Sequence, residues 1–536
     1  MSYYQKDLIH KYEGFKLLSL DLKENSLTSR SDLSYSFVGD NDEQNSIYTT
    51  VIIGANGTGK SNLFRIIVEL LKELYDLSKD KGRSYNIDGL FKLHFSTHGD
   101  LFEYSNYTTE NNQDNRVDAY LLRNGKAIDF KDVQLPLAIV ANSIMLTDKF
   151  PFYKGGVNSD VFPQYKYLGV RNIPQSASTR AYVRRTVEFI VEQFRNKEIN
   201  KKGFIDGLIR ATNFLELDNS INVFYYTSNN AKFFKGNLTP NVLSDYFESI
   251  RAKYSESTTR PPYKLDQFLK IKEDGKLIQS ICDFCNQLVN ENRLEKPPYK
   301  GSSIRKITYN LIEPKLQELL QAEYVMLEHL RQLGIIYAPE IELKRTDGYS
   351  LQESSSGEYH FFSSIVGLMA TIRPTNSLVL IDEPEISLHP NWQMKYFSFL
   401  RELFSHSEYS TCHILVATHS HFLISDLKGN SSKIIGLKRN NGKIETIELP
   451  KDIDTYGWSA EDVLYNIFNV RSSLNYYLEA DLTELLGMIA NNSKDRNKIK
   501  PIIDKLKELP QRKNDPLQEI IKEAEDYLTK LQWFDS

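Results

Sequence analysis

Two short segments carry residue types that could bind and cleave a chain of phosphates. Residues 54–61 read GANGTGKS, which matches G-x-x-x-x-G-K-[ST] in full. The glycines let the backbone curl so that its N–H groups point at phosphate oxygens. Lys60 would reach the β- and γ-phosphates of a nucleotide, and Ser61 would hold Mg²⁺. The residues expected to contact the nucleotide here are Asn56, Gly57, Thr58, Gly59, Lys60, Ser61 and Asn62.

The second segment is Ser377–Pro384, which reads SLVLIDEP. Asp382 would hold Mg²⁺, usually through water, because this ion prefers hard oxygen ligands and keeps part of its hydration shell. Glu383 follows directly and is placed to orient or deprotonate an attacking water. An ordinary acidic turn after a strand is the alternative, but beside the glycine-rich loop the pair predicts a site for ATP and Mg²⁺.

Buried strands and a helix must position these groups. Residues 48–53 (YTTVII) form a short β-branched run typical of a buried strand, and SLVLI is another. An amphipathic helix is predicted directly after the glycine-rich loop. Its N-terminus would add the positive end of a helix dipole to the phosphate site. The helix has one apolar stripe, formed by Leu63, Ile66, Ile67, Leu70, Leu71 and Leu74.

A third motif narrows the class. Glu353–Glu358 (ESSSGE) precedes the Asp-Glu pair, and the strand His413–Ala417 (HILVA) after it ends in Thr-His-Ser. In this order the chain resembles the ABC-type ATPases, which include SMC proteins, related DNA-repair ATPases and OLD-like AAA proteins. The resemblance implies that His419 contacts the γ-phosphate and that Ile386–Pro390 forms a D-loop at a dimer interface. It also implies a signature motif that binds the γ-phosphate held by the other subunit, at Ser355, Ser356, Gly357 and Glu358.

Simpler interpretations exist for each part of this third motif. The serines could form a capped turn, and His419 could be a satisfied core histidine. In this family a glutamine that senses Mg²⁺ follows the strand at Ala138–Ser143 (AIVANS). No such glutamine is evident, and Asn142 is the substitute that the position offers.

Composition limits the possibilities. The chain has 536 residues, a net charge of −4 and three cysteines, which fit a cytoplasmic protein with more than one core and no overall basic character. No segment is long enough for a membrane span. Cys282 and Cys285 form a lone C-x-x-C without two further ligands nearby, so we interpret them as buried small residues.

The predicted fold is α/β: an ABC-type P-loop ATPase head with a helical insertion and a helical C-terminal tail. Residues 1–150 would form the first half of the head, including an antiparallel sheet over 85–130, and residues 336–450 the second half. Residues 451–536 would form a helical tail that docks a partner, with a capping box at Ser459 and Asp462. Residues 151–335 would be a mostly helical insertion, with helices at Ala181–Asn196, Val242–Lys253, Lys276–Asn292 and Ile304–Leu333.

Charge in the insertion leaves two interpretations open. Arginines gather between residues 171 and 185 and could contact the phosphates of DNA or RNA. A solvated helix face with ion pairs is the alternative. The arginines are Arg171, Arg180, Arg184 and Arg185.

A narrower resemblance concerns the ATPases of the Septu antiphage system, including those attached to retrons. Four stretches carry it: 142–153 (NSIMLTDKFPFY), 165–172 (YKYLGVRN), 351–389 and 454–470 (DTYGWSAEDVLYNIFNV). It implies a homodimer or higher homo-oligomer that hydrolyses ATP slowly and controls a separate HNH-type nuclease. DNA or a retron RNA–DNA product would be a further partner.

Three rival functions stay open from the sequence. One is the ATPase of a PARIS-like system with a Toprim effector. Another is a DNA-repair or SMC-like ATPase that acts on DNA directly, and the third is a scaffold with structural ATP. The tail offers neither the carboxylates of a Toprim domain nor an HNH motif, so the chain is not expected to cut nucleic acid itself.

Overall fold

The computed structural model divides into two compact units, Met1–Gly457 and Trp458–Ser536, and each is considered by itself. The described residues are 14–28, 31–39, 47–82, 88–110, 113–145, 147–153, 161–173, 176–177, 179–195, 201–229, 231–255, 262–297, 303–345, 356–373, 376–405, 411–427, 431–440, 442–447, 476–491, 493–508 and 516–533.

The first unit contains a six-stranded antiparallel sheet in the order β2-β1-β4-β5-β6-β7. Its hairpin turns explain the local sequence. His98-Gly99 and Asn124-Gly125 all have positive φ, as a two-residue hairpin loop with right-handed strand twist requires. The sheet predicted over 85–130 is confirmed. Its strands are β1 (Lys16–Lys23), β2 (Leu33–Ser36), β4 (Leu90–Thr97), β5 (Asp100–Glu110), β6 (Gln113–Arg123) and β7 (Lys126–Ala127).

A seven-stranded, mostly parallel sheet forms the centre of this unit, in the order β18-β17-β3-β16-β15-β8-β9. The three central strands are buried along their whole length, which explains their apolar and β-branched sequences. Only β18 runs antiparallel to its neighbour. The strands are β3 (Tyr48–Gly54), β8 (Ala138–Ser143), β9 (Tyr165–Tyr167), β15 (Ser377–Asp382), β16 (His413–Thr418), β17 (Ser432–Asn440) and β18 (Lys443–Ile447).

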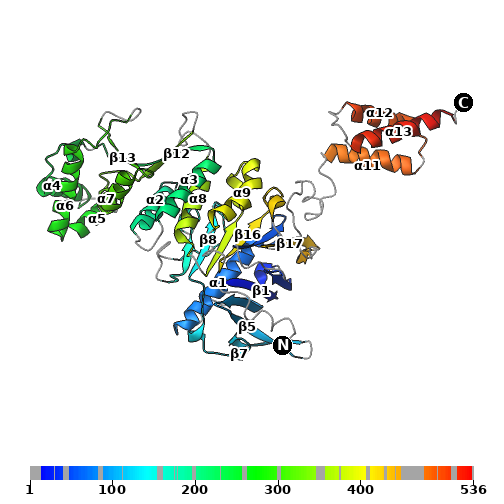
Figure 1. Ribbon diagram of the computed structural model, residues 1–536, viewed down its shortest axis with the longest axis horizontal. Coiled ribbons are helices and arrows are strands. Elements are labelled where there is room, and N and C mark those ends of the chain that lie inside the picture. The colour runs from blue at the N-terminus through cyan, green and yellow to red at the C-terminus, as the bar shows by residue number, and fades with distance from the viewer. Residues whose placement is uncertain are drawn as a thin grey trace. The chain divides into compact units, whose positions relative to one another are not determined.

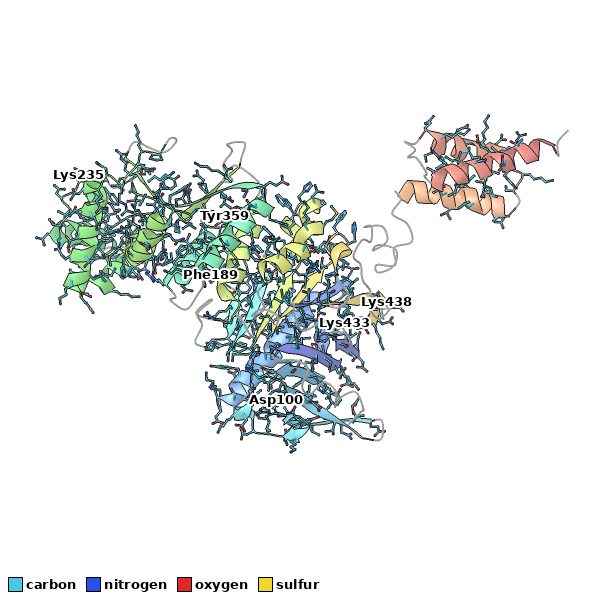
Figure 2. The ribbon with its side chains drawn as sticks, in the orientation of Figure 1. Asp100, Phe189, Lys235, Tyr359, Lys433 and Lys438 are labelled. Carbon is cyan, nitrogen blue, oxygen red and sulfur yellow. The ribbon has the colours of Figure 1, made fainter. Side chains whose placement is uncertain are left out.

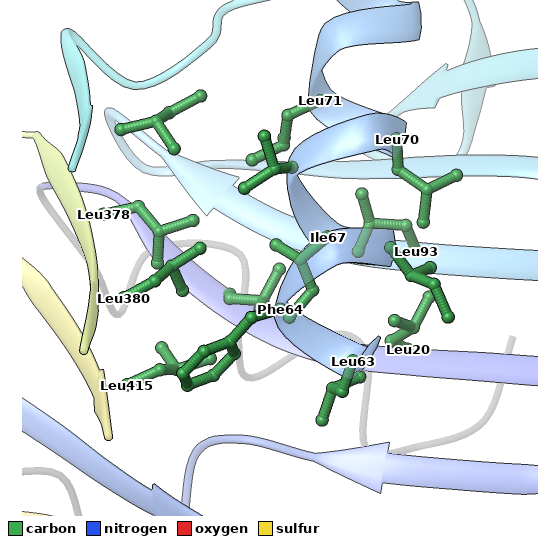
Figure 3. Close-up of a cluster of buried hydrophobic side chains, with 14 of the residues drawn as sticks. Leu20, Leu63, Phe64, Ile67, Leu70, Leu71, Leu93, Leu378, Leu380 and Leu415 are labelled. Carbon is green, nitrogen blue, oxygen red and sulfur yellow. The ribbon is translucent and has the colours of Figure 1, made fainter. Parts of the chain in front are cut away.

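Helix α1 (Lys60–Ser78) lies between the two sheets and forms one core with both. Figure 3 shows Phe64, Ile67 and Leu71 facing Leu378, Leu380 and Leu415 of the parallel sheet, while Leu63 and Leu70 face Leu20 and Leu93 of the antiparallel sheet. A helix that is apolar around most of its circumference is stable only when it is covered on several sides. This packing fixes the N-terminus of α1 at the carboxyl ends of the parallel strands.

Helices α2 (Thr179–Arg195), α3 (Lys201–Phe214), α8 (Ser356–Thr371) and α9 (Pro390–Leu403) lie on the other side of the parallel sheet from α1 (Figure 1). Aromatic rings join them, since Phe214 of α3 stacks on Phe361 of α8 at 5.0 Å and contacts Phe399 of α9 at 4.5 Å. Phe189 of α2 and Tyr359 of α8 belong to the same layer (Figure 2). The helix that begins at the signature segment is therefore held from several directions.

The rest of the insertion combines helices with a small antiparallel sheet in the order β13-β12-β14. The predicted helices near 181–196, 242–253 and 276–292 are confirmed within a few residues. Between them lie α3 and α5, which the sequence analysis did not identify. The elements are β12 (Leu217–Tyr226), β13 (Lys306–Asn310), β14 (Glu340–Arg345), α4 (Pro240–Ser255), α5 (Tyr263–Lys272), α6 (Gly275–Asn290) and α7 (Pro314–Gln332).

The helix predicted over Ile304–Leu333 is wrong in its first part. Residues 306–310 alternate between buried and half-buried and pair with β12, as a strand does. Pro314 does not interrupt a helix but begins one, because proline lacks the N–H that the first helical turn leaves unused. In α6, Cys282 and Cys285 are buried, as expected for structural residues.

The second unit is a bundle of α11 (Tyr476–Ala490), α12 (Arg496–Lys507) and α13 (Pro516–Trp533). Its core is made by Leu485, Ile499, Ile503, Leu506 and Ala524. The described part of the tail is thus helical, as predicted. The predicted capping box at Ser459 and Asp462 lies outside the described residues. None of the described helices has the length and apolarity to cross a membrane.

Candidate nucleotide site

The glycine-rich loop joins β3 to α1 and has the backbone that its sequence predicts. Gly57 and Gly59 adopt φ values of 80° and 90°, which residues with side chains rarely tolerate. At Gly54 an added Cβ would lie 2.6 Å from the Leu437 carbonyl oxygen. The Thr58 hydroxyl closes the turn by donating to the Ala55 carbonyl at 2.8 Å. The loop is thus shaped by the close approach of Gly54 to Leu437 and by two left-handed glycines. Residues 55–57 are exposed.

Lys60 is buried at the start of α1 and folds back over this loop. Its Nζ donates to the carbonyl oxygen of Gly54 at 2.7 Å and lies 3.4 Å from that of Ala55. Burial lowers the pKa of this amine, and the nearby carboxylates of Glu383, Asp382 and Glu385 oppose that shift. A desolvated cation that donates to backbone carbonyl groups is well prepared to accept the oxygens of a phosphate chain.

Ser61 and Asp382 meet although they belong to different elements. The Ser61 hydroxyl donates to Asp382 Oδ1 at 3.1 Å. Asp382 is 1% exposed, and its second oxygen, Oδ2, is buried with no hydrogen-bond partner among the described residues. Burial raises the pKa of this carboxyl to about 7, although the Ser61 hydrogen bond acts in the opposite direction. A hydroxyl, a carboxylate and an unsatisfied buried oxygen are a donor set that suits Mg²⁺.

Glu383 follows at the end of β15 in a left-handed conformation with φ of 49°. Its backbone N–H donates to the Ala417 carbonyl at 2.8 Å, so the neighbouring strand β16 holds the turn in place. A non-glycine residue at positive φ costs free energy and is typical of functional sites. Glu383 Oε1 lies 3.7 Å from His419 Nδ1, so the predicted base and the predicted γ-phosphate contact are neighbours.

His419 follows directly after β16 and lies next to Glu385, a residue that the sequence motifs did not point to. Its Nδ1 lies 3.1 Å from Glu385 Oε1, and its side chain is 43% exposed. It is therefore not a satisfied core histidine. The parallel pairing Asp382↔Ala417 brings the two strand ends together. The second glutamate in the sequence Asp-Glu-Pro-Glu was the available signal, but only the fold shows that it contacts His419.

Asn142 lies on β8 beside Ile381 and is buried. Its Nδ2 donates to the Ser364 hydroxyl of α8 at 2.5 Å, and its Oδ1 has no hydrogen-bond partner among the residues described. The side chain links the nucleotide-side strand to the signature helix. Its predicted substitution for a glutamine stays a prediction.

The signature segment is described only in part. Ser355 and the side chain of Ser356 lie outside the described residues, while Gly357 and Glu358 are buried in the first turn of α8. A carboxylate in the first turn of a helix is favourable to the helix dipole. Glu358 is therefore placed to stabilise the start of this helix.

Arg171 is not part of an exposed phosphate-binding patch. It is buried, and its Nε and Nη2 donate to Asp148 Oδ2 and Oδ1 at 3.0 and 2.5 Å. The Tyr167 hydroxyl also donates to Asp148, at 2.7 Å. Arg184 lies 3.9 Å from Glu328, and Arg185 donates to the Gly169 carbonyl at 2.5 Å. The ion-pair interpretation is thus the better one, and the side chain of Arg180 lies outside the described residues.

Strand order, loop and strand-end residues together define an α/β P-loop ATPase head. The profile of the family described as "AAA domain, putative AbiEii toxin, Type IV TA system" matches residues 149–425, more than half of the 536-residue chain. The chain belongs to this family. No curated protein matches it.

Solved structures offer distant likenesses. The SMC head domain from Thermotoga maritima is 11% identical, with a TM-score of 0.33 over 82% of this chain and 99% of that one. An Smc head domain with an extended coiled coil from Pyrococcus furiosus is 13% identical, with a TM-score of 0.30 over 85% and 100%. The recombination mediator RecF is 12% identical, with a TM-score of 0.27 over 82% and 100%. At these scores the fold rests on the strand order of this chain itself.

Proposed function

We propose that the chain binds ATP with Mg²⁺ and hydrolyses it, as one of two heads that close around the nucleotide. The single observation that carries this proposal is the convergence of Lys60, Ser61, Asp382, Glu383 and His419. They come from α1, β15 and the end of β16 and meet at the carboxyl edge of the parallel sheet. In α/β proteins this edge is where ligands bind.

The residues divide the chemistry among them. Lys60 and the loop N–H groups would hold the β- and γ-phosphates, while Ser61 and Asp382 would hold Mg²⁺. The bound ion would neutralise charge that develops on the phosphate oxygens. Glu383 would orient and deprotonate the attacking water, and His419 would donate a hydrogen bond to the γ-phosphate.

A second copy of the chain would complete the site. In the proposed dimer, Ser355–Glu358 of each subunit would meet the γ-phosphate bound by the other, as the resemblance to ABC-type ATPases implies. The D-loop turn supports a contact at this edge, because Ile386 is 50% exposed beside the ATP residues and Met394 of α9 is exposed as well. Exposed apolar side chains next to a binding edge are typical of contact surfaces.

Mixing two inactive variants tests the composite sites. Lys60→Ala removes the phosphate cation, and Ser356→Arg would block the γ-phosphate of the other subunit, so each alone should hydrolyse little ATP. In a mixed dimer one of the two sites carries both defects and the other is intact. Recovery of up to about a quarter of wild-type turnover is expected for random pairing of independent sites. No recovery in dimers shown to be mixed would contradict sites built from two subunits.

The biological setting that we propose is antiphage defence in the cytoplasm, with a separate HNH-type nuclease controlled by the ATP state. Support comes from the resemblance to Septu ATPases and from a family description that names a toxin of a TA system. Deleting Asp454–Ser536 should spare ATP binding and abolish co-purification of the nuclease. A Toprim partner in its place would favour the PARIS-like alternative.

A direct role on DNA is the less supported function. It would need an exposed basic surface, and Arg171 and Arg185 instead bind groups within their own subunit. Metal-dependent cleavage of DNA or RNA by the isolated chain would overturn the division between ATPase and nuclease. Salt-sensitive DNA binding that follows ATP would favour the SMC-like alternative.

A further inference from the structure

The proposed mechanism leaves one buried carboxylate beside the site without a role. Glu385 lies three residues beyond Asp382, on the short 3₁₀ turn η6 (Pro384–Ser387). It is 5% exposed. A buried carboxylate is costly unless several donors compensate its charge. The contacts of Glu385 therefore indicate what it does.

Two donors from the end of β16 converge on one oxygen of this side chain, and a ring nitrogen lies beside it. Glu385 Oε1 accepts from the Thr418 hydroxyl at 2.7 Å and from the His419 backbone N–H at 2.7 Å. The ring nitrogen Nδ1 of His419 lies 3.1 Å from the same oxygen. The other oxygen, Oε2, is buried without a hydrogen-bond partner among the described residues. The backbone of His419 is thus bonded to this carboxylate, and its ring lies next to the same oxygen.

Glu385, and not the predicted base, is the carboxylate that lies closer to the ring. Glu383 Oε1 is 3.7 Å from His419 Nδ1, beyond hydrogen-bond length, whereas Glu385 Oε1 is within it. A carboxylate oxygen offers only lone pairs, so an approach of 3.1 Å favours the ring form with its proton on Nδ1. The opposite nitrogen, Nε2, is then the one left to meet a phosphate. A carboxylate on one ring nitrogen commonly sets the orientation of the other.

A second tie holds the same two segments together. Gln393 of α9 donates to the carbonyl oxygens of Leu388 and Glu385 at 2.9 and 3.3 Å. Its Oε1 accepts from the Ser420 hydroxyl at 2.5 Å. The turn after Asp382 and the segment after β16 are therefore linked on both sides of His419. Such a brace can hold a ring on an otherwise open edge.

We propose that Glu385 is a positioning residue for ATP hydrolysis, which fixes the ring orientation and the protonated nitrogen of His419, with Gln393 bracing the segments that carry them. The inference rests on the proposed function, because His419 needs a defined orientation only if it meets the γ-phosphate. Glu385 itself touches no reacting atom. Its effect on turnover must pass through His419.

A double-mutant cycle with steady-state ATP hydrolysis tests that dependence. Glu385→Gln keeps an acceptor for Thr418 and loses the charge that aligns the ring. It should lower kcat by about 10- to 100-fold, as loss of an outer partner of a functional histidine does. The KM for ATP should change less than about threefold, because the contacts that bind ATP in its ground state are retained. Glu402→Gln, an exposed charge removal on α9, is the matched control and should leave kcat unchanged.

The decisive arm is the variant that carries Glu385→Gln and His419→Ala together. Its kcat should match that of His419→Ala alone within about twofold, because residues that act through one another are not additive. Reductions that multiply would show that Glu385 acts independently of His419 and would overturn the inference. So would a wild-type kcat in Glu385→Gln.

A measurement on the wild-type protein covers the case of a variant that does not fold. Histidine-selective ¹⁵N NMR, with His419→Ala to assign the signal, should show the neutral His419 ring protonated at Nδ1. Protonation at Nε2 alone would overturn the inference. This readout needs no turnover. If wild type hydrolyses no ATP but the Nδ1 proton is present, the proposed function fails and the geometric inference stands.

Discussion

Two rows of polar side chains with similar composition lie on the two sheets of the head. The antiparallel sheet carries Ser19, His94, Glu103 and Tyr120. Their contacts are 3.0 Å from Ser19 Oγ to His94 Nδ1, 3.1 Å from His94 Nε2 to Glu103 Oε2 and 2.9 Å from Tyr120 to Glu103 Oε1. Ser19 pairs with His94, and His94 with Glu103, in strand register. Every named group in this row has a partner, and these hydrogen bonds help to lower the pKa of Glu103.

The edge of the parallel sheet differs in what it leaves unsatisfied. Asp382 and Glu385 each keep a buried oxygen without a hydrogen-bond partner among the described residues, and Glu383 holds a left-handed backbone. Polar side chains that hydrogen-bond to one another contribute stability. Buried charged groups without partners lower the stability of the ligand-free protein. Residue types alone would not separate the two rows. Unsatisfied groups and strain distinguish the row for which we propose a function.

The largest expected effect comes from removing the Lys60 cation from the proposed nucleotide site. Lys60→Ala should weaken Mg·ATP binding by at least about 100-fold, because a charge-assisted contact is lost and carboxylates remain nearby. Binding of a fluorescent ATP analogue measures this. Lys126→Ala, at an exposed position on β7, is the matched control and should bind as wild type does. Undiminished ATP binding by Lys60→Ala would contradict the view that the edge of the parallel sheet, unlike the polar row on the antiparallel sheet, binds a nucleotide.

Asp382→Asn should separate function from stability at the same position. The pKa of Asp382 is raised to about 7, so its charge destabilises the ligand-free fold above that pH and does so less as pH falls towards its usual value. At pH 8 the variant should gain on the order of 2 kcal/mol in unfolding free energy while losing Mg²⁺-dependent ATP binding. Urea unfolding at pH 8 and pH 5 checks it. A destabilised variant at pH 8 would contradict the unsatisfied-charge account.

The two ends of β16 carry histidines in opposite environments, since His413 begins the strand and is buried, whereas the partly exposed His419 follows it. His413 is fully buried, accepts from the Leu17 backbone N–H at 3.1 Å and has its Nε2 2.8 Å from the Thr50 hydroxyl. Burial, with Lys16 nearby, lowers the pKa of His413 well below its usual value. The stability that its neutral form provides is complete above about pH 6.5 and falls by up to about 1.4 kcal/mol per pH unit below it. Urea midpoints of wild type and His413→Gln between pH 8 and pH 5 measure this, and the variant should lack that component of the slope.

The smallest effect on ATP turnover is expected in the hydrogen-bonded row of the antiparallel sheet. His94→Ala should lower the free energy of unfolding by about 1 kcal/mol, the scale of a cross-strand pair. ATP turnover should stay within about twofold of wild type, because the row lies on the other sheet. Thermal unfolding and a hydrolysis assay check both statements. A large loss of turnover with little loss of stability would give this row a function that the account denies it.

The residues that we propose for the nucleotide edge could be found from the sequence because they lie in short local patterns. Lys60 and Ser61 belong to one loop, and Asp382 and Glu383 to one strand end, so strand and loop rules were enough. Glu385 was missed because its partner is 34 residues further along the chain. The role of Arg171 stayed open in the sequence for the same reason, since its partner Asp148 lies 23 residues before it.

The helical insertion shows the limit of periodicity. Residues 306–310 continue into a helical pattern, yet β12, more than 80 residues earlier, recruits them into a sheet through pairs such as Asn222↔Asn310. Pairing across such distances is set by tertiary packing and is not visible in a local window. The helices α4 and α6 were predicted correctly because their apolar stripes are local.

ATP hydrolysis by the variant Glu383→Gln is the sharpest test of whether the carboxyl edge of the parallel sheet is a hydrolytic site. Wild type should turn over Mg·ATP. This variant should bind ATP with similar affinity and hydrolyse it at least about 100-fold more slowly, since the amide keeps the shape and loses the basicity. Binding and phosphate release should be measured on the same preparation, with Glu402→Gln as the control. Phosphate release by Glu383→Gln at the wild-type rate would contradict the claim that this sheet edge is the hydrolytic site.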